Sequence, residues 1–237
     1  KNRSHMEHKQ YEKREEYKAR QINASVSKFS YCKTSYRDVY RYLEIIRSSK
    51  REHSEQLKIG PVACLGVRNG REVDLFRVAL SSGWMRRQLV HCLEQKWHGF
   101  SPRIPLVESV GRSGYRNLSD KSCVGVEINP LVRRPDIWVG SFDELPEEWE
   151  QKFDVAFSNA FDHSFDALKT AESWRQILRP GGYLIIQFPE RQTPSPLDPV
   201  GSLTVEDFGK LFPGEIVYFH ARGSNWKYTE YIFRMCT

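Results

Sequence analysis

Short apolar runs bounded by turn residues recur from residue 62 onward. They are Val62–Leu65, Cys123–Ile128, Ile137–Val139, Phe153–Phe157 and Tyr183–Phe188. A short run without apolar–polar alternation is typical of a strand that is buried on both faces of a parallel sheet. The pattern therefore predicts a strand at each of these ranges.

Segments with helical spacing of apolar residues separate these strands. A helix is predicted over about 35–50, and another follows the first strand as far as about Leu80. Asp166 can cap a third helix, which Arg179–Gly182 ends, and Thr204 opens a fourth with a pattern similar to a capping box. The apolar positions that define the first and third helices are Tyr36, Val39, Tyr40, Leu43 and Ile46, and Leu168, Ala171, Trp174 and Leu178.

The end of the chain alternates apolar and polar residues. Glu215–Ala221 and Thr229–Met235 flank the turn-like segment Arg222–Asn225, which predicts an antiparallel hairpin. Strands that alternate with helices form a doubly wound, mainly parallel sheet. The predicted fold class is therefore α/β: a Rossmann-like, doubly wound, mainly parallel sheet with a C-terminal antiparallel hairpin.

The first 58 residues differ from the rest of the chain. Residues 1–5 read as a vector scar ahead of Met6. Residues 7–22 contain few apolar positions, which predicts an exposed helix or a disordered tail. We assign 1–58 to the scar and a charged helical extension, and 59–237 to one domain with a basic insertion at about 84–122.

Composition narrows the class of protein. Of the 237 residues 39% are hydrophobic, yet no apolar run approaches the roughly 20 residues that cross a bilayer, and no apolar signal-peptide core follows the N-terminus. The five cysteines are odd in number and far apart, with no CxxC pair. This argues against a zinc site and a disulfide framework, and we expect a cytoplasmic protein without a membrane span.

Charge is distributed unevenly along the chain. Residues 1–122 carry 25 Lys and Arg against 13 Asp and Glu, whereas residues 123–237 carry 11 against 17. A basic half suggests an anionic partner, such as nucleic acid, a phosphorylated metabolite or a membrane surface. The alternative is a solvated charged surface, because residues 8–20 mix both signs.

A glycine-containing turn, Gly66-x-x-x-Gly70, follows the first predicted strand. Backbone N–H groups at such a turn and at the start of the next helix can approach a ligand closely. Glu127, at the end of the next strand, is placed to accept hydrogen bonds from both ribose hydroxyls of an adenosine. The glycine spacing is not the GxGxxG of NAD enzymes, which disfavours an NAD-dependent oxidoreductase.

From about Pro61 to its C-terminus the chain resembles the class I S-adenosylmethionine-dependent methyltransferase family. The matching segments are the first motif Val62–Gly70, the ribose-binding strand end Gly125–Ile128, the adenine-side loop Gly140–Pro146, the fourth-strand motif Phe153–Asn159 and the late signature Ile177–Leu184. The resemblance implies S-adenosylmethionine as cofactor and methyl transfer as reaction. The candidate cofactor-binding residues are Gly66, Val67, Arg68, Gly70, Glu72, Glu127, Ile128, Ser141, Phe142, Asp143, Asn159 and Ala160.

Three positions depart from that family's pattern. The family usually has an acidic residue at Cys64, a glycine at Arg68 and an aspartate at Ser141. We expect Arg68 either to pair with the carboxylate of the cofactor's methionine moiety, held in place by Glu72, or to be a solvent-facing turn residue paired only with Glu72. The departures also leave a weakened or non-catalytic binder as an alternative.

Ser158–Ser164 follows the fourth strand, where the resemblance puts the reaction centre. Asn159 would lie beside the cofactor's methionine portion, and Phe161 could face the sulfonium or the acceptor. His163 and Asp162 are the candidate catalytic residues, because they are proton acceptors; the alternative for His163 is a structural role. The sequence identifies no third ligand for a metal ion, and we assign no metal.

About 57 residues separate Gly66 from Cys123, where one helix and a short loop would suffice. The surplus, Trp84–Ser122, carries seven Lys and Arg against three acidic residues and interleaves aromatic side chains with arginines. Such rings can stack on a flat acceptor or on bases, or can simply pack the insertion onto the domain. We expect this insertion and the helix over 35–50 to reach over the carboxyl ends of the strands.

Three functions fit these patterns. The favoured one is a methyltransferase for a small, anionic acceptor, with the insertion and the N-terminal helices as a lid. The alternatives are a methyltransferase for RNA or another nucleic acid, and a non-catalytic cofactor-binding module that acts as a partner or sensor. The methyl donor is already activated, so the motifs need no residue that is specific for one acceptor, and they do not identify it. They do not identify an oligomeric state either.

Overall fold

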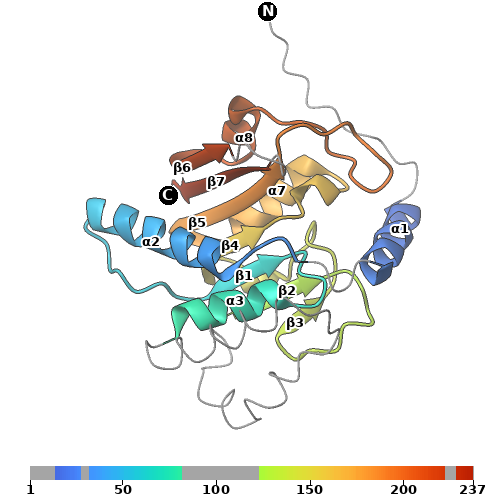
Figure 1. The fold of residues 1–237 in the computed structure, drawn as a ribbon, viewed down its shortest axis with the longest axis horizontal. Helices are drawn as coiled ribbons and strands as arrows, with labels where there is room; N and C mark the ends of the chain where they lie inside the picture. The colour runs from blue at the N-terminus through green and yellow to red at the C-terminus, as the bar shows by residue number, and fades with distance from the viewer. Residues whose placement is uncertain (1–13, 28–31, 82–122, 222–227, 237) are drawn as a thin grey trace, which may run out of the picture.

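The structure is a computed structural model that describes residues 14–27, 32–81, 123–221 and 228–236 (Figure 1). The predicted vector scar and the predicted insertion at 84–122 lie outside the described residues. Within the described part of the chain, no helix is long and apolar enough to span a membrane.

A seven-stranded sheet organises the fold, in the order β3-β2-β1-β4-β5-β7-β6. β1 to β5 run parallel, and β7 runs antiparallel to both of its neighbours, β5 and β6. This confirms the predicted fold class and the antiparallel C-terminal pair, with β7 inserted between β5 and β6. The strands are β1 (Val62–Leu65), β2 (Cys123–Glu127), β3 (Ile137–Val139), β4 (Phe153–Ser158), β5 (Leu178–Pro189), β6 (Gly214–Ala221) and β7 (Tyr228–Met235).

Helices begin where the sequence supplies capping residues. Ser35 and Thr204 each form a capping box with an aspartate three residues later, and Asp166 accepts from the N–H groups of the first turn that follows it. The helices are α1 (Arg14–Ser27), α2 (Tyr36–Glu52), α3 (Arg71–Leu80), α7 (Ala167–Gln176) and α8 (Val205–Leu211), with 3₁₀ turns η2 (Glu147–Trp149) and η3 (Phe161–His163).

Two hydrophobic clusters hold helices against opposite faces of the sheet. On one face, apolar residues of α2 and α3 pack on alternate positions of β1, β4 and β5. On the other face, Trp174 of α7 and Phe208 of α8 pack on the intervening positions. Because both faces are covered, the central strands are apolar at nearly every position, which is the pattern that made them recognisable in sequence.

Two helix assignments from sequence need correction. Leu178 is the first residue of β5 and not part of α7, and Leu168 is 65% exposed, so neither belongs to the buried face of that helix. In α2 the buried stripe is formed by Val39, Tyr42, Leu43 and Ile46, whereas Tyr40 is exposed. Tyr42 belongs to this buried stripe, and its hydroxyl donates to the buried Glu230 carboxylate at 2.6 Å.

The position of α1 differs most from expectation. The sequence predicted an exposed helix or a disordered tail, and predicted that α2 would cover the carboxyl ends of the strands. Instead α2 lies along one face of the sheet, and α1 lies beside the carboxyl ends of β1, β2 and β3 (Figure 1). Its Tyr17, Gln21 and Ser25 are buried there.

β1 and β4 are neighbours from which the chain winds in opposite directions, which makes the gap beyond their carboxyl ends a topological switch point. Ligands of open α/β sheets bind at such points. Gly66 follows β1 at φ +82°, and a Cβ there would lie 2.6 Å from the Cβ of Ala160, after β4. Only glycine permits this close approach of the two loops.

Candidate functional site

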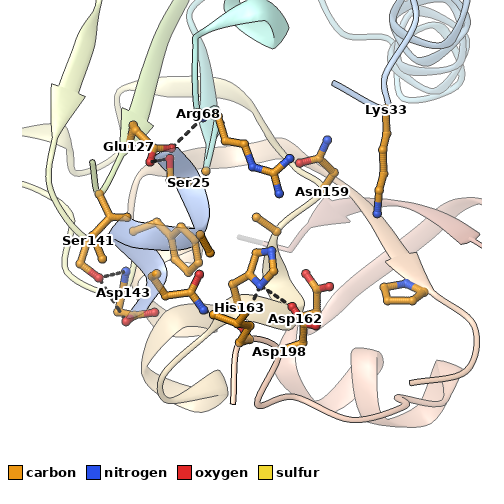
Figure 2. Close-up of a pocket in the computed structure, with 18 of the residues that line it drawn as sticks. Ser25, Lys33, Arg68, Glu127, Ser141, Asp143, Asn159, Asp162, His163 and Asp198 are labelled. Carbon is orange, nitrogen blue, oxygen red and sulfur yellow. Dashed lines mark hydrogen bonds and ion pairs between the residues drawn. The ribbon is translucent and has the colours of Figure 1, made fainter. Parts of the chain in front are cut away.

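A cavity of about 590 Å³ opens at this switch point (Figure 2). Its volume falls within the range of small-molecule sites, roughly 300–1,000 Å³. The structure brings most of the sequence-predicted site residues to its walls. The predicted residues that line it are Gly66, Arg68, Glu72, Glu127, Ile128, Ser141, Phe142, Asp143, Asn159, Ala160, Asp162 and His163.

Val67 and Gly70 do not line the cavity. The Val67 side chain is buried in the cluster beneath α3, and its N–H donates to the Val126 carbonyl. Gly70 begins α3 in the left-handed conformation, with φ +80°. Both residues shape the turn whose other residues face the cavity.

Glu127 ends β2 at one side of the cavity and is buried. Its Oε2 accepts from the Arg68 N–H at 2.7 Å. Its Oε1 accepts from the Ser25 hydroxyl at 2.8 Å and from the Asn129 N–H at 3.1 Å. The carboxylate is thus held rigidly toward the cavity by three chain segments, one of which is α1.

Arg68 and Glu72 lie between Glu127 and the loop after β4. Arg68 has φ +48°, in the left-handed region that favours glycine, although it is an arginine. Glu72 is buried; its Oε1 accepts from Cys32 Sγ at 3.3 Å and from Asn159 Nδ2 at 3.4 Å. Burial raises the pKa of Glu72, against hydrogen bonds from Cys32 and Asn159 and the charge of Arg68, which lower it.

The second carboxylate oxygen of Glu72, Oε2, is buried and has no hydrogen-bond partner among the described residues. A buried carboxylate oxygen left unpaired costs free energy, so such atoms commonly mark where a ligand binds. The predicted role of Glu72 as a support for Arg68 is therefore at most part of its role.

Ser141, Phe142 and Asp143 form the wall beyond β3. Asp143 accepts from the hydroxyls of Thr170 and Ser141, and burial raises the pKa of Asp143 against those hydrogen bonds. Phe142 is fixed by its carbonyl, which accepts from the indole of Trp174 at 3.1 Å. The ring of Phe142 and the polar edge of Asp143 form a surface suited to a flat heterocycle.

A cluster of Asp162, His163 and Asp198 lies across the cavity from Glu127 (Figure 2). His163 Nδ1 is 2.8 Å from Asp198 Oδ1 and 3.0 Å from the Leu197 carbonyl. Burial disfavours the imidazolium, but the charge of Asp162 and the hydrogen bond and charge of Asp198 outweigh it, so the pKa of His163 is raised. One ligand atom from each of the three residues lies within 4.8 Å of the others, so they form a candidate metal group whose third member the sequence did not identify.

Phe161 does not face the cavity, which corrects its predicted place beside the sulfonium. Its ring is fully buried and packs against Trp174 and Phe212 on the α7–α8 face of the sheet. The 3₁₀ turn η3 has three residues per turn, so its three side chains point in three directions: Asp162 and His163 reach the cavity, and Phe161 is buried in the core.

The sequence analysis missed the contribution of α1 and of the segment that follows it. Tyr17, Gln21 and Ser25 form one wall, and Lys33 and Tyr228 meet at another, where the Lys33 ammonium lies 4.0 Å from the Tyr228 ring centroid. Tyr17, Gln21 and Ser25 are spaced by four, which puts them on one helix face. Their polarity concealed this stripe from a search for apolar positions.

Comparison with solved structures gives the fold a class. The chain is similar to the 1,6-didemethyltoxoflavin-N1-methyltransferase of Burkholderia thailandensis, solved with 1,6-didemethyltoxoflavin and S-adenosylhomocysteine bound: TM-score 0.53, 16% identity, 97% of this chain and 93% of that chain covered. At this identity the likeness shows the fold, and it confirms the predicted Rossmann-like methyltransferase fold.

Two further structures are similar over most of their length. A complex of the Haloferax volcanii Trm112 methyltransferase activator with a methyltransferase gives a TM-score of 0.47 at 12% identity, covering 94% of this chain and 98% of that chain. A Thermotoga maritima S-adenosylmethionine-dependent methyltransferase gives 0.44 at 14% identity, covering 92% and 98%. No family model matches the chain, and no curated protein matches it in sequence.

Proposed function

We propose that the chain is an S-adenosylmethionine-dependent methyltransferase that acts on a small acceptor. The proposal rests on one cavity at the switch point that is lined both by a ribose-type carboxylate, Glu127, and by Glu72, whose Oε2 has no hydrogen-bond partner among the described residues. An adenosine with an attached amino acid has groups that match both. The neighbour from Burkholderia carries such a ligand, S-adenosylhomocysteine, in a protein of the same fold.

The polar groups of the cavity fit the cofactor part by part. Glu127 would accept from the ribose hydroxyls, as the sequence predicted. Glu72 Oε2 would accept from the α-ammonium of the methionine moiety, and the Arg68 guanidinium would bind its carboxylate. In this way Glu72 takes over the acidic role that the family's first motif gives to the position of Cys64, which here is buried in the core.

The adenine would lie against Phe142, between Ile128 and Asp143. Asp143 accepts hydrogen bonds, so it can bind an exocyclic amine. Asn159 and Ala160 follow β4 and would border the methionine portion. These assignments leave the walls formed by Lys33, Tyr228 and the Asp162–His163–Asp198 cluster for the acceptor.

When bound, the cofactor would supply a methyl group already activated on a sulfonium. The protein then has to align the acceptor with that methyl group and exclude water. α1 serves the second purpose, because it forms a wall of the cavity at the carboxyl ends of the strands. His163 and Asp162 are the groups placed to take a proton from the acceptor.

The wall formed by α1 supports a small acceptor over a nucleic acid. Tyr17 donates to the His163 carbonyl, and Gln21 donates to the Leu197 carbonyl, so α1 bridges the space above the cluster. A polymer would have to displace this helix to reach the centre. A small molecule needs only the cavity.

Calorimetry with S-adenosylhomocysteine tests the proposal. We expect binding with a Kd on the order of micromolar, about −8 kcal/mol, and competition by S-adenosylmethionine. Glu150→Gln, which changes a carboxylate outside the cavity, is the control and should bind equally. Absence of binding by the folded wild-type chain would exclude the methyltransferase assignment, whereas binding without transfer to any acceptor would favour the non-catalytic module.

A further inference from the structure

His163 is oriented by two acceptors on the same ring nitrogen. Asp198 Oδ1 and the Leu197 carbonyl both lie within hydrogen-bond distance of Nδ1, at 2.8 and 3.0 Å. Neither can donate, so Nδ1 carries the proton. In the neutral ring Nε2 is then the basic nitrogen, and Figure 2 shows that side of the ring turned into the cavity, away from Asp198.

The turn that carries His163 is fixed from above by α1. Tyr17 donates its hydroxyl to the His163 carbonyl and accepts from Gln21 Nε2 at 2.6 Å. Gln21 also donates to the Leu197 carbonyl, the same oxygen that faces Nδ1. Imidazole, loop and helix therefore form one connected hydrogen-bonded unit, which restricts the ring to a single orientation.

Asp162 presents an unmet hydrogen-bond acceptor at the same place. Its side chain is 8% exposed and lines the cavity, and within the described part of the chain its Oδ1 has no hydrogen-bond partner. A buried carboxylate oxygen without a partner costs free energy, so a ligand that brings a hydrogen-bond donor or a positive charge to it is favoured. Asp198 adds a second negative charge beside His163, so an anionic group in contact with these two carboxylates would be repelled.

We propose that Asp198 positions His163 as the general base of methyl transfer and that Asp162 binds an N–H group of the acceptor, which is an amine or a nitrogen heterocycle. This rests on the proposed methyltransferase function. It replaces the anionic acceptor that the sequence suggested, because that expectation came from a basic insertion outside the described residues, whereas Asp162 and Asp198, the described side chains beside His163, are acidic.

The lone pair of the acceptor nitrogen forms a bond to the methyl carbon, and His163 Nε2 takes the N–H proton that becomes acidic as positive charge develops on that nitrogen. The bond between that carbon and the sulfonium sulfur breaks, and its electron pair stays on sulfur as a neutral thioether. The imidazolium that forms is stabilised by Asp198 and Asp162 until its proton leaves to water.

The charges around His163 set the pH dependence of this step. The titratable groups that meet it are Asp162 in the same turn, Asp198 from the loop after β5 and Tyr17 from α1. The two carboxylates hold the imidazolium, so the base becomes free only above the ordinary histidine pKa of 6.5. Transfer should therefore rise with pH through that raised value.

NMR of the full chain, with ¹⁵N-labelled histidines, tests the role of Asp198 without any acceptor. His163→Gln assigns the signal. We expect the Nδ1–H tautomer in the wild type, and Asp198→Asn should lower the pKa of His163, because it removes a hydrogen-bonded negative charge. The matched control is Glu190→Gln, in the same loop but outside the cavity lining. An Nε2–H tautomer, or an equal pKa in Asp198→Asn and the wild type, would overturn the positioning role.

Transfer to defined probes tests the acceptor class. With S-adenosylmethionine, we expect S-adenosylhomocysteine to form with imidazole, benzylamine or 2-aminopyridine, and not with benzoate. Asp198→Asn should lower kcat about tenfold or more and move the acidic limb of the pH profile to lower pH, with unchanged cofactor affinity. Preference for phenol or benzoate, or no turnover of any amine by a protein that binds cofactor, would overturn the acceptor class.

Two further measurements distinguish the general-base proposal from the proposed methyltransferase function and from a metal site. Failure of the wild type to bind S-adenosylhomocysteine in calorimetry contradicts the proposed function, whereas the NMR result on Asp198 stands independently of it. Titration with Mg²⁺, Mn²⁺ and Zn²⁺ tests the candidate metal group. Micromolar metal binding that is lost in Asp162→Asn and in Asp198→Asn, and that displaces the Nδ1 proton, would make this cluster a metal site and overturn the proposal.

Discussion

The two ends of the cavity differ in how their carboxylates are satisfied. At the end where we propose that the cofactor binds, both oxygens of Glu127 already accept hydrogen bonds from the chain itself, one of them from Ser25 of α1. At the end where we propose that the acceptor binds, Asp162 has an oxygen with no partner in the described part of the chain. A ligand would therefore replace existing hydrogen bonds of Glu127 and supply a missing hydrogen bond to Asp162.

Glu72 is intermediate, since its Oε1 accepts hydrogen bonds and its Oε2 has no partner among the residues that the structure describes. Its position next to Arg68 is where the cofactor's amino acid would lie. We therefore expect substitutions to act differently along the cavity. At Glu127 a substitution removes hydrogen bonds to the ligand, whereas at Glu72 it also removes a buried carboxylate oxygen that has no partner among the described residues.

The largest effect should come from Glu127→Ala. It removes two charge-assisted hydrogen bonds to the ribose, each about 1.5–3 kcal/mol, so S-adenosylhomocysteine should bind at least about 100-fold more weakly in calorimetry. Glu127→Gln keeps the size of the side chain but should lose most of this affinity as well, because its amide nitrogen cannot accept a hydrogen bond. Adenine, which has no ribose, should bind wild type and variant alike; unchanged affinity for S-adenosylhomocysteine would mean that the ribose lies elsewhere.

Arg68→Gly separates the shape of the turn from recognition. Glycine suits φ +48°, so stability should change by less than about 1 kcal/mol. Loss of the guanidinium should weaken S-adenosylhomocysteine roughly tenfold, the loss of one charge-assisted hydrogen bond, and should spare adenosine, which lacks the carboxylate. Equal losses for the two ligands would show that Arg68 only shapes the turn.

Glu72→Gln should stabilise the free protein while it weakens cofactor binding. Because burial raises the pKa of Glu72, its contribution to stability is fully present below the ordinary value of 4.5 and is lost as pH rises through the folded-state value. At pH 7 the variant should melt about 2–4 °C higher, the change that 1 kcal/mol produces at this chain length. The difference should vanish toward pH 4; a lower melting temperature at pH 7 would show that the Glu72 carboxylate stabilises the free protein.

The smallest effect concerns α1. The Ser25 hydroxyl holds the oxygen of Glu127 that a ribose hydroxyl would use, so Ser25→Ala should tighten S-adenosylhomocysteine binding by roughly threefold, part of one hydrogen bond. Ser27→Ala is the matched control, because that hydroxyl bonds within α1 to the Ala24 carbonyl. Weaker binding by Ser25→Ala would show instead that Ser25 contacts the bound ribose.

The strands and most of the cavity could be predicted from sequence for a physical reason. Doubly wound sheets bury both faces of their strands, so β1, β4 and β5 are visible as apolar runs, and the residues that follow such strands converge at one edge. Glu127 and His163 were identified in that way. Phe161 was misplaced because nothing in the sequence reveals which side of a 3₁₀ turn a side chain takes.

The contacts of α1 and of Asp198 could not be predicted. Tyr17 meets His163 across 146 residues of sequence, and Asp198 belongs to a loop without periodicity. Pairings of this kind depend on tertiary packing and not on local pattern. The spacing by four of Tyr17, Gln21 and Ser25 indicates one face of a helix, but the sequence does not show which residues that face contacts.

A crystal structure with S-adenosylhomocysteine bound would locate each part of the cofactor in the cavity. We expect the ribose hydroxyls on Glu127, the α-ammonium on Glu72 Oε2, and the sulfur facing the side of the cavity where Asp162 and His163 lie. A ligand whose sulfur points away from Asp162 and His163, or whose ribose makes no contact with Glu127, would contradict this expectation.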